Sequence, residues 1–473
     1  MRETNLVDGK WLGTSNKLDI HDPANGAVVG QIDYGNANMA AQACDAAEAA
    51  FKHWSNISPR QRADHLLAGA SELAKDTKEI AHTLALEAGK RISESIGEVQ
   101  GAVEYFRWFA EEARRPIGFL YPNEQDGRRH LSVAKPAGVA ACLTPWNFPI
   151  SIQARKIAPA LAAGCTVVAR ASEKAPLAVV MMYCALQRAG LPAGVLNLVH
   201  GPADEITHAY LDHPAVRVVS FTGSTEVGRS ILKTASNRIV RPLMELGGSA
   251  PFIVFNDADI DLAVTTAMIA KFRNNGQSCI AANKFIVQRE IFEEFSTRLA
   301  KRVDEMTLGS GVADPEPDLG PCIDTHRVDA VMSMVTEALG KGARQLTRNF
   351  ILPEEGSFCA PAIFVDVPDD CALNREEIFG PVASLVSFDD EDEAIMKANS
   401  SELGLASYAM TNDQGRIWRL SKQIDTGILG VNDPSPTTAF IPMGGTKQSG
   451  LGREGGRQGL EEFQEIQYIA QRF

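Results

Sequence analysis

The spacing of apolar residues divides the chain into two kinds of region. Before residue 138, alanine and leucine recur at helical intervals between polar residues, a pattern that predicts long helices. We expect these helices over residues 39–51, 59–86 and 92–114. From residue 138 onward, short apolar runs alternate with helical stretches, which is typical of a parallel α/β sheet. The expected strands are 138–143, 166–170, 195–199 and 216–221, with helices at 152–162 and 176–189.

Three further stretches complete the predicted architecture. Residues 5–11 resemble a β-hairpin near the start of the chain. A second α/β region is expected from 250 to about 432. Two prolines and a glycine interrupt the helical pattern at 115–126, and an alternating strand follows at 128–134. This strand could project from the body of the protein and pair elsewhere.

Composition narrows the class of protein. At 473 residues the chain exceeds a single hydrophobic core, so two or three units are expected. Its residues are 45% hydrophobic and 22% charged, as in an ordinary globular protein. A net charge of −13 argues against binding to nucleic acid or to an anionic membrane. The longest apolar run, 177–186, is half the length that a membrane span requires, so we expect no membrane partner.

Cysteine and histidine usage predicts a reducing compartment and no metal site. The eight cysteines contain no Cys-x-x-Cys pair, and the first residues lack the apolar stretch of a signal peptide. Both features favour a cytoplasmic protein. The nine histidines form no His-Glu-x-x-His or comparable cluster, so no metal site is expected.

Cys279 is the strongest candidate for a reactive residue. Small and polar neighbours precede it, and Gly276 could let a ligand approach the backbone, so the thiol is expected to be reachable. Upstream, Glu245 lies in an apolar frame where burial could raise its pKa. A thiol nucleophile and such a carboxylate are the two parts that covalent chemistry through a thioester requires. A lone cysteine is more often a small buried residue, and only its neighbours favour catalysis here.

Four loops follow predicted strands, and parallel sheets bind ligands at the carboxyl ends of their strands. In the first, Pro145 and Pro149 hold Asn147, whose amide could stabilise an oxyanion or merely support the turn. The second offers Glu173, which could meet a ribose diol but taken alone is more often a helix carboxylate facing water. The third, 221–228, carries glycines and hydroxyls that can cradle a pyrophosphate.

The remaining loop and one glycine-rich stretch are less specific. Residues 376–381 place two adjacent acids before an aromatic residue and a rigid turn, and could form a surface turn or a second ribose contact. Residues 450–455 fit the Gly-x-Gly-x-x-Gly dinucleotide fingerprint. They lie too close to the C-terminus for a βαβ unit, so we interpret that match as a decoy.

Taken together, in this order and spacing, these loops resemble the aldehyde dehydrogenase superfamily over nearly the whole chain. The matching segments are 145–149, 221–228, 245–248, 276–279, 377–381 and 442–454. The resemblance implies an NAD(P)-dependent oxidation of an aldehyde to a carboxylic acid. It also implies an α/β fold with a Rossmann-like cofactor domain, a catalytic α/β domain and a bridging β-element that pairs subunits into a homodimer or homotetramer. In this division the cofactor domain comprises residues 1–112 and 132–247, the catalytic domain comprises 248–445, and the bridging element comprises 113–131 and 446–473.

The resemblance also implies residue roles by position. Cys279 matches the nucleophile that forms a thiohemiacetal and then a thioester, and Glu245 matches the base that activates water. Asn147 and the Cys279 backbone N–H would hold the oxyanion, and Lys156 and Glu454 match positions that assist proton transfer. The residues implied to contact the cofactor are Thr144, Pro145, Trp146, Arg170, Ser172, Glu173, Phe221, Thr222, Gly223, Ser224, Gly228, Leu246, Gly247, Glu377 and Phe379.

The adenosine end of this implied cofactor site departs from the family pattern. Arg170 stands where relatives usually carry lysine, and its bidentate guanidinium favours the extra phosphate of NADP. Glu173 opposes this, because a carboxylate repels a 2′-phosphate. We expect NAD as the cofactor, with NADP as the alternative.

Within the superfamily the chain most resembles succinate-semialdehyde dehydrogenases. Arg155 and Arg273 occupy positions where that subgroup binds the substrate carboxylate, and Thr437 or Thr438 could replace a serine hydroxyl there. Two guanidinium groups beside a thiol favour an anion, although either could pair with one of the chain's own acids. Two prolines in 433–440 are unlike the subgroup, so glutarate semialdehyde or a sulfonated aldehyde stays open. A redox-free thiol hydrolase is a weaker alternative, because none of these loops contains a histidine partner.

Overall fold

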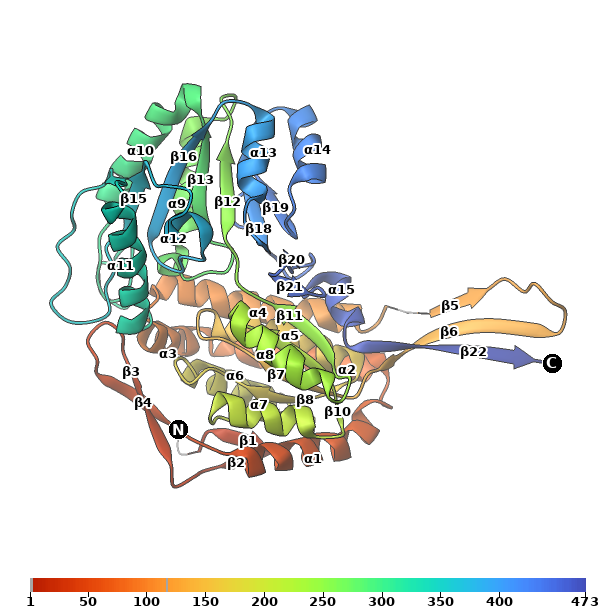
Figure 1. The fold of residues 1–473 in the computed structure, drawn as a ribbon. Helices are drawn as coiled ribbons and strands as arrows, with labels where there is room; N and C mark the ends of the chain where they lie inside the picture. Colours follow the sequence, from red (N-terminus) through yellow and green to blue (C-terminus); the bar gives the residue numbers. More distant parts are fainter. Residues whose placement is uncertain (1–2, 116–117) are drawn as a thin grey trace.

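The structure, a computed structural model, describes residues 3–115 and 118–473, and two large sheets dominate it (Figure 1). The larger sheet has eight strands in the order β2-β1-β9-β8-β7-β10-β11-β21. The five strands from β9 to β11 run parallel to one another, and β1 and β21 join antiparallel on either side. The strands are β1 Asn5–Val7, β2 Lys10–Leu12, β7 Val139–Leu143, β8 Thr166–Arg170, β9 Leu196–Leu198, β10 Val216–Thr222, β11 Arg241–Glu245 and β21 Gly450–Leu451.

Helices cover both faces of this eight-stranded sheet. Because side chains alternate along a strand, Ala140 and Cys142 of β7 pack into a core with α2 to α6, while Val139 and Ala141 pack with α1, α7 and α8. Burial on both faces explains why these strands read as continuous apolar runs. The helices are α1 Ala37–Trp54, α2 Pro59–Lys75, α3 Thr77–Ala88, α4 Ile92–Glu112, α5 Pro149–Ala163, α6 Leu177–Arg188, α7 Ala203–Asp212 and α8 Thr225–Ser236.

The second sheet has seven strands in the order β14-β15-β16-β13-β12-β18-β19 and is parallel except at β14. This confirms the second α/β region. Its strands are β12 Ala250–Val254, β13 Ala282–Gln288, β14 Arg344–Gln345, β15 Ala362–Val365, β16 Val382–Phe388, β18 Ala406–Met410 and β19 Ile428–Val431. Its helices are α9 Ile260–Phe272, α10 Phe292–Asp304, α11 Thr325–Gly340, α12 Ala372–Arg375, α13 Glu391–Asn399 and α14 Gln414–Gln423.

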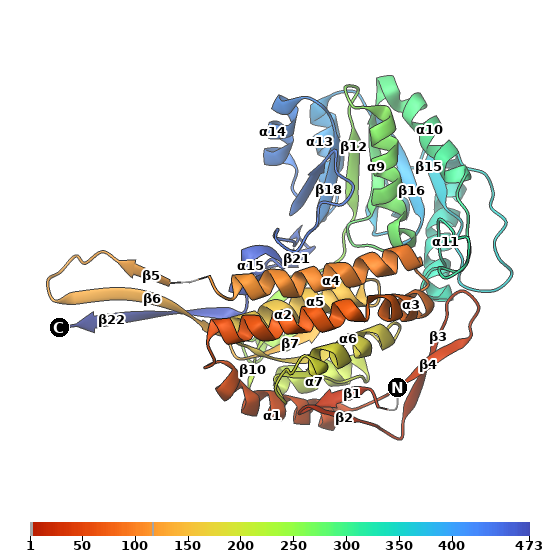
Figure 2. The ribbon, with the colours of Figure 1, turned by 180° about the vertical axis from the view of Figure 1, so that it is seen from behind.

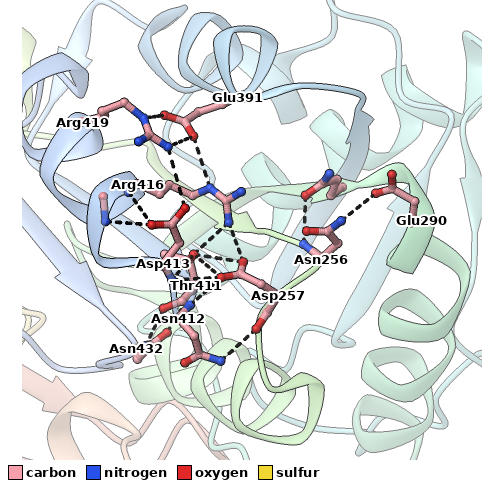
Figure 3. A network of polar contacts seen from close by, with 12 residues as sticks. Asn256, Asp257, Glu290, Glu391, Thr411, Asn412, Asp413, Arg416, Arg419 and Asn432 are labelled. Atoms are coloured by element: carbon pink, nitrogen blue, oxygen red, sulfur yellow. Dashed lines mark hydrogen bonds and ion pairs between the residues drawn. The ribbon is translucent and has the colours of Figure 1, made fainter.

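A polar network fastens α14 to the carboxyl ends of β12 and β18 (Figure 3). The Asp257 carboxylate accepts a hydrogen bond from the Thr411 hydroxyl at 2.8 Å and pairs with Arg416 at 2.6 Å. Arg416 and Arg419 both reach Glu391 of α13, at 3.3 and 2.6 Å. Since these acids and arginines satisfy one another, we interpret the network as structural.

A three-stranded sheet ordered β22-β6-β5 projects from the body, as both views show (Figures 1 and 2). Its strands are β5 Gly118–Tyr121, β6 Arg128–Pro136 and β22 Gln464–Arg472. The strand predicted at 128–134 is therefore confirmed, and it pairs antiparallel with the C-terminal strand. Residues 116–117 of the predicted bridging element lie outside the described residues. The domain boundaries stay a prediction.

The single helix predicted over 59–86 is wrong, because α2 and α3 are separate helices that meet at Asp76. Asp76 leaves the helical conformation, with φ −92° and ψ 7°, and its carboxylate pairs with Arg188 of α6. The apolar spacing runs through the break because Leu73 of α2 and Ile80 of α3 enter the same core. A periodic pattern therefore does not reveal this boundary.

Strand β11 was not predicted, and its sequence explains why. Arg241, Pro242 and Glu245 leave it without an apolar run, and proline is disfavoured within a sheet. Pro242 is tolerated because β21 pairs only with Met244 and Glu245, so no strand pairs with the outer side of β11 at Pro242. That pairing also confirms the 450–455 stretch as a decoy, since β21 is antiparallel and belongs to no βαβ unit.

The remaining short elements are β3 Lys17–His21, β4 Val28–Asp33, β17 Leu403–Gly404, β20 Thr446–Lys447, α15 Gly456–Glu461 and the 3₁₀ turns η1 Arg273–Gly276 and η2 Arg289–Ile291. The hairpin expected near residue 5 is formed by β1 and β2. Among the described residues, no helix combines the length and the apolar character that crossing a membrane requires.

Candidate active site

Cys279 follows a left-handed turn at the end of α9. Asn274, Asn275 and Gly276 all have positive φ, at 51°, 59° and 72°. A Cβ at Gly276 would lie 2.1 Å from the carbonyl oxygen of Gly380, so only glycine fits there. We expected this glycine to admit a ligand; instead, the close neighbour is the backbone of the Gly380 turn. The turn thus packs the nucleophile loop against the loop that carries Glu377.

The Asn147 loop and the Cys279 loop are tied together by hydrogen bonds. The Asn147 side-chain amide donates to the Gln277 carbonyl at 3.2 Å, and the Asn274 amide donates to the carbonyls of Asn147 and Gln277 at 3.0 and 3.1 Å. Lys90 also donates to the Asn147 carbonyl at 2.7 Å. Asn147 is buried and lines the same cavity as Cys279, and these hydrogen bonds hold its loop in place there.

Two cavities meet at Cys279, which is partly exposed and lines both. We name them by one residue each. The Trp146 cavity, about 310 Å³, is lined by Pro145, Trp146, Asn147, Thr222, Gly223, Ser224, Glu245, Leu246, Gly247, Cys279, Arg327, Glu377 and Phe379. The Arg273 cavity, about 480 Å³, is lined by Glu94, Gly97, Glu98, Gly101, Glu104, Tyr105, Phe148, Ser151, Ile152, Arg155, Arg273, Ser278, Cys279, Ile280, Thr437, Thr438, Ala439 and Met443.

These two linings bring together most of the residues that the sequence selected. The catalytic candidates Cys279, Glu245 and Asn147 line the Trp146 cavity, and the four substrate candidates line the Arg273 cavity. Lys156 and Glu454 line neither, and are buried behind Arg155. The cofactor candidates outside the Trp146 cavity are Thr144, Arg170, Ser172, Glu173, Phe221 and Gly228.

Glu245 and Cys279 interact electrostatically at the junction of the cavities. Burial raises the pKa of Glu245 to about 7, and neither of its carboxylate oxygens has a hydrogen-bond partner of good geometry among the described residues. Burial, followed by the negative charge of Glu245, raises the pKa of the Cys279 thiol well above its usual value, and Arg155 partly offsets this. The thiol is therefore neutral at rest and adjacent to a carboxylate that takes up protons near neutrality.

Arg155 belongs to a buried ion-pair network. Its Nε lies 2.7 Å from Oε2 of Glu454, and Lys156 pairs with the same carboxylate and donates to the Ser220 hydroxyl at 3.1 Å. Of the two alternatives left open for Arg155, pairing with an acid of this chain is the one that the structure contains, although Arg155 also lines the Arg273 cavity. The pKa of Glu454 is lowered by Lys156 and Arg155 despite its burial, so it stays ionised.

Arg273 is the cation of the Arg273 cavity that has no ion-pair partner among the described residues. Its guanidinium lies 5.2 Å from the centre of the Phe148 ring. The acids that line the same cavity pair elsewhere: Glu94 with Arg91, Glu98 with Lys90 and Glu104 with Arg107. Its charge is therefore free for a ligand.

The Trp146 cavity has the features of a site for a polar, planar ligand. The Thr222 hydroxyl and the Nε of Arg327 are buried and lack hydrogen-bond partners among the described residues. Phe379 packs edge-on against Trp146 with ring centres 5.5 Å apart. Glu377 accepts a hydrogen bond from the Gly248 N–H at 3.0 Å, and burial raises its pKa to about 7. These unsatisfied groups fit the ribose and phosphate oxygens of a dinucleotide.

At the far end of the predicted cofactor site, Arg170 and Glu173 interact with each other. Nη2 of Arg170 lies 2.5 Å from Oε2 of Glu173, and its Nε donates to the Gly201 carbonyl at 3.1 Å. Arg170 is the last residue of β8 and Glu173 follows it. They lie next to the end of β7, where the Thr144 N–H donates to the Arg170 carbonyl at 3.1 Å. The charge of Arg170 is thus partly neutralised.

Among the lining residues that sequence reasoning did not select are Arg327 of the Trp146 cavity and Tyr105 of the Arg273 cavity. Arg327 lies on α11, far along the chain from every loop that the patterns selected, and Tyr105 lies in the amphipathic helix α4. The aromatic residue reads as an ordinary core position in that helix. Neither residue has a local signal that separates it from a structural side chain.

Comparison with known proteins settles the family. A sequence model of the aldehyde dehydrogenase family matches residues 11–469. The chain belongs to the aldehyde dehydrogenase family. The chain is 39% identical to the NADP(+) succinate-semialdehyde dehydrogenase GabD of Escherichia coli (strain K12), 40% identical to a 3-sulfolactaldehyde dehydrogenase of Pseudomonas putida, and 38% identical to a glutarate-semialdehyde dehydrogenase of Pseudomonas putida strain KT2440. In each case the match covers 99% of this chain and 97% of the relative.

Solved structures agree on the fold. The enzyme superposes on an NADP-dependent enzyme of E. coli with a TM-score of 0.98, at 38% identity, covering 100% of this chain and 98% of the other. It superposes on a betaine aldehyde dehydrogenase of Staphylococcus aureus, solved in complex with NAD+, with a TM-score of 0.96 at 32% identity, covering 99% and 94%. The α/β fold and the activity of an NAD(P)-dependent aldehyde dehydrogenase are therefore confirmed. The specific substrate is unresolved among the names of these relatives.

Proposed function

We propose that the enzyme oxidises a short anionic aldehyde, with succinate semialdehyde as the first candidate, through a thioester on Cys279. The preference for an anionic substrate is supported by the guanidinium of Arg273, which lines the same cavity as the thiol and has no ion-pair partner in the part of the chain that the structure describes. Arginine binds carboxylates and sulfonates through the same paired N–H donors. Glutarate semialdehyde and a sulfonated aldehyde therefore remain alternatives. Relatives named for each of the three substrates have nearly the same sequence identity to this chain, so the identities do not favour one substrate over the others.

In the proposed first step, the Cys279 sulfur bonds to the aldehyde carbon. The thiol starts out neutral, and its proton passes to Glu245, whose pKa of about 7 lets it accept a proton near neutral pH. The aldehyde oxygen becomes an oxyanion. The Asn147 amide and the Cys279 backbone N–H would donate hydrogen bonds to it, which stabilises the developing charge.

The remaining steps release the acid. When bound, the nicotinamide cofactor takes up the hydride that leaves the aldehyde carbon, so that Cys279 carries a thioester. Glu245, once deprotonated, removes a proton from water, which attacks the thioester carbon and displaces the thiolate. In this proposal Glu454 and Lys156 assist proton transfer from behind Arg155, and the Ser220 hydroxyl links them at 3.1 Å to Lys156 and 3.3 Å to Glu454.

The role of Arg273 predicts a substrate preference. The wild-type enzyme is expected to favour succinate semialdehyde over butanal by about 100-fold in kcat/KM, roughly 2.7 kcal/mol of discrimination. Arg273→Ala should remove most of this preference by lowering turnover of the anionic aldehyde. Arg155→Ala should lower turnover of both aldehydes, because it leaves the buried Glu454 carboxylate with only one of its two cationic partners, Lys156. Steady-state formation of reduced cofactor with the two substrates measures each ratio.

A matched control is available for the arginine substitution. Arg348 also stacks on a phenylalanine, at 4.2 Å from the Phe350 ring centre, but lines neither cavity. Arg348→Ala should leave the preference unchanged. If Arg273→Ala lowered turnover of butanal as much as that of succinate semialdehyde, Arg273 would be a structural residue and the anionic substrate class would be wrong.

For the cofactor we propose a preference for NAD over NADP. Arg170 already pairs with Glu173, and the same carboxylate would repel a 2′-phosphate. Glu173→Gln is expected to raise the ratio of kcat/KM for NADP over NAD by about tenfold, or roughly 1.4 kcal/mol. Reduced-cofactor formation at limiting NAD or NADP measures this ratio. An unchanged ratio would show that Glu173 does not discriminate between the 2′-hydroxyl of NAD and the 2′-phosphate of NADP.

We further propose that the projecting sheet joins copies of the chain into a homodimer or homotetramer. Large apolar side chains are exposed on it, including Phe119 at 64%, Leu120 at 72% and Ile466 at 65%. An isolated monomer rarely exposes so many large apolar residues on one thin element. The sheet also ends in an exposed strand, β22, with eight of its nine residues exposed.

A further inference from the structure

The loop that carries Asn147 rests on a buried ion pair. Lys90, between α3 and α4, is only 2% exposed, and its ammonium pairs with the Glu98 carboxylate of α4. The same ammonium donates to the Asn147 carbonyl at 2.7 Å and lies 4.3 Å from the centre of the Phe148 ring. Burying a lysine is costly unless its donors have partners, and these three contacts supply them.

Glu98 extends this support to the helix that begins just after Asn147. One oxygen of its carboxylate accepts hydrogen bonds from the Ile150 and Ser151 N–H groups, at 2.9 and 3.3 Å, in the first turn of α5. The other oxygen pairs with Lys90. A carboxylate is favoured at the N-terminus of a helix, so a single side chain fixes both α5 and the Lys90 ammonium.

One turn earlier on α4, Glu94 holds the nucleophile loop. Its carboxylate accepts a hydrogen bond from the Asn274 N–H at 3.0 Å. The Asn147 carbonyl therefore accepts from two supported donors, Lys90 at 2.7 Å and the Asn274 amide at 3.0 Å. The start of α4 is thus a common support for two loops that belong to different sheets, the Asn147 loop after β7 and the Cys279 loop before β13.

The Asn147 side chain depends on this support for its position. Its amide donates to the Gln277 carbonyl at 3.2 Å, and its amide oxygen has no hydrogen-bond partner among the described residues. A side-chain amide carries two N–H donors, so the second is available to a ligand in the Trp146 cavity, which Asn147 lines. Where that N–H lies is set mainly by the main chain of the loop, to which Lys90 is bonded.

We propose that Lys90, paired with Glu98, is a positioning residue for the oxidation. It fixes the main chain of Asn147 so that the side-chain amide meets the oxyanion formed when Cys279 attacks the aldehyde. This rests on the proposed function, in which Asn147 donates to that oxyanion. Lys90 lines neither cavity, and its charge is balanced by Glu98, so it acts through the position of Asn147 rather than through contact with the substrate.

The test is a double-mutant cycle between Lys90 and Asn147. Asn147→Ala alone should lower kcat/KM by about 10²- to 10³-fold, as expected for the loss of an oxyanion donor. Lys90→Met alone should lower kcat/KM by about 30-fold, because a small displacement of the donor weakens its contact with the oxyanion. In the Asn147→Ala background, Lys90→Met should cost less than about threefold, since no amide remains to be positioned.

Two further measurements separate positioning from a general loss of structure. Alkylation of the Cys279 sulfur by iodoacetamide displaces iodide and forms no oxyanion, so Lys90→Met should change its rate by less than about threefold. Combining Lys90→Met with Glu98→Gln leaves no charge buried alone. This double variant should lower kcat/KM about as much as Lys90→Met, and it keeps the test valid if Lys90→Met fails to fold.

The chain offers a matched control for Glu98. Glu87 is 1% exposed and accepts hydrogen bonds from the Leu177 and Ala178 N–H groups, at 2.7 and 2.8 Å, at the start of α6. It therefore supports a helix N-terminus as Glu98 does, but it lines neither cavity. Glu87→Gln should leave kcat/KM unchanged, whereas Glu98→Gln should lower it by about tenfold or more.

The outcomes distinguish this inference from the proposed function. If Lys90→Met cost less than about threefold, or cost the same with and without the Asn147 amide, Lys90 would be a structural residue and the inference would be wrong. The proposed mechanism would then stand. If Asn147→Ala itself left kcat/KM unchanged, the oxyanion role of Asn147 in the proposed function would be wrong, and the positioning role of Lys90 with it.

Discussion

Replacing Cys279 with alanine is expected to lower kcat/KM by roughly 10⁴-fold or more, since the covalent route through the thioester is removed. Cofactor binding should persist. The substitution removes only a sulfur atom between the two cavities and leaves Thr222, Arg327 and Glu377 in place. Reduced-cofactor formation measures the first effect, and titration calorimetry with NAD measures the second.

The control for this substitution is another free cysteine. Cys184 of α6 is partly exposed and lines neither cavity, so Cys184→Ala should behave as the wild type. Turnover by Cys279→Ala above about one per cent of the wild-type rate would contradict the proposed nucleophile. Loss of both turnover and cofactor binding would instead indicate that the variant had lost its fold.

Replacing Glu245 with glutamine should slow hydrolysis more than acylation. The change removes the group that accepts the thiol proton, but it also removes the negative charge that raises the pKa of the Cys279 thiol, so the thiol can lose its proton to water instead. The glutamine amide cannot take a proton from water, so the thioester should hydrolyse about 10²- to 10⁴-fold more slowly. Rapid mixing should then give a burst of reduced cofactor approaching one equivalent per site, followed by a slow phase. Hydroxylamine, a nucleophile that requires no base at neutral pH, should accelerate the slow phase. A slow phase that hydroxylamine leaves unchanged would mean that thioester hydrolysis is not the impaired step.

The pH dependence of hydrolysis should follow the pKa of Glu245. Burial raises this pKa to about 7, so the carboxylate is largely protonated below pH 7 and cannot accept a proton from water. The hydrolysis rate of the wild-type enzyme should therefore rise as pH increases through about 7 and then level off. Glu245→Gln should lose this inflection. The slow phase measured between pH 5.5 and 8.5 tests this, and an inflection that survives in the variant would assign the titration to another group.

Most of the two sheets could be predicted because buried parallel strands have a local signature. Residues 139–143 and 166–170 are continuous apolar runs bounded by turns, and the structure has strands at both. The site loops meet for a topological reason. Strands β7, β10 and β11 are parallel neighbours, so the loops at Thr144, Gly223 and Leu246 emerge on one edge of the sheet.

Elements without such a signature were missed. Strand β11 contains Pro242 and two charged ends, and it is a strand only because β10 pairs with it along its length. The break between α2 and α3 is also hidden, since both helices bury their apolar residues in one core. In both cases tertiary pairing outweighs the local pattern.

The sequence by itself determined the family and the α/β fold, and it selected the residues that we propose for the chemistry, because reactive side chains and strand ends leave short, local patterns around Cys279 and Glu245. Tertiary structure alone decided how the charges and the empty spaces are arranged. Arg155 pairs with Glu454, almost three hundred residues away, whereas Arg273 in the same cavity has no ion-pair partner among the described residues. Gly101 borders open space rather than packed side chains. Ion pairs and cavities depend on residues from distant parts of the chain, so no local pattern records them.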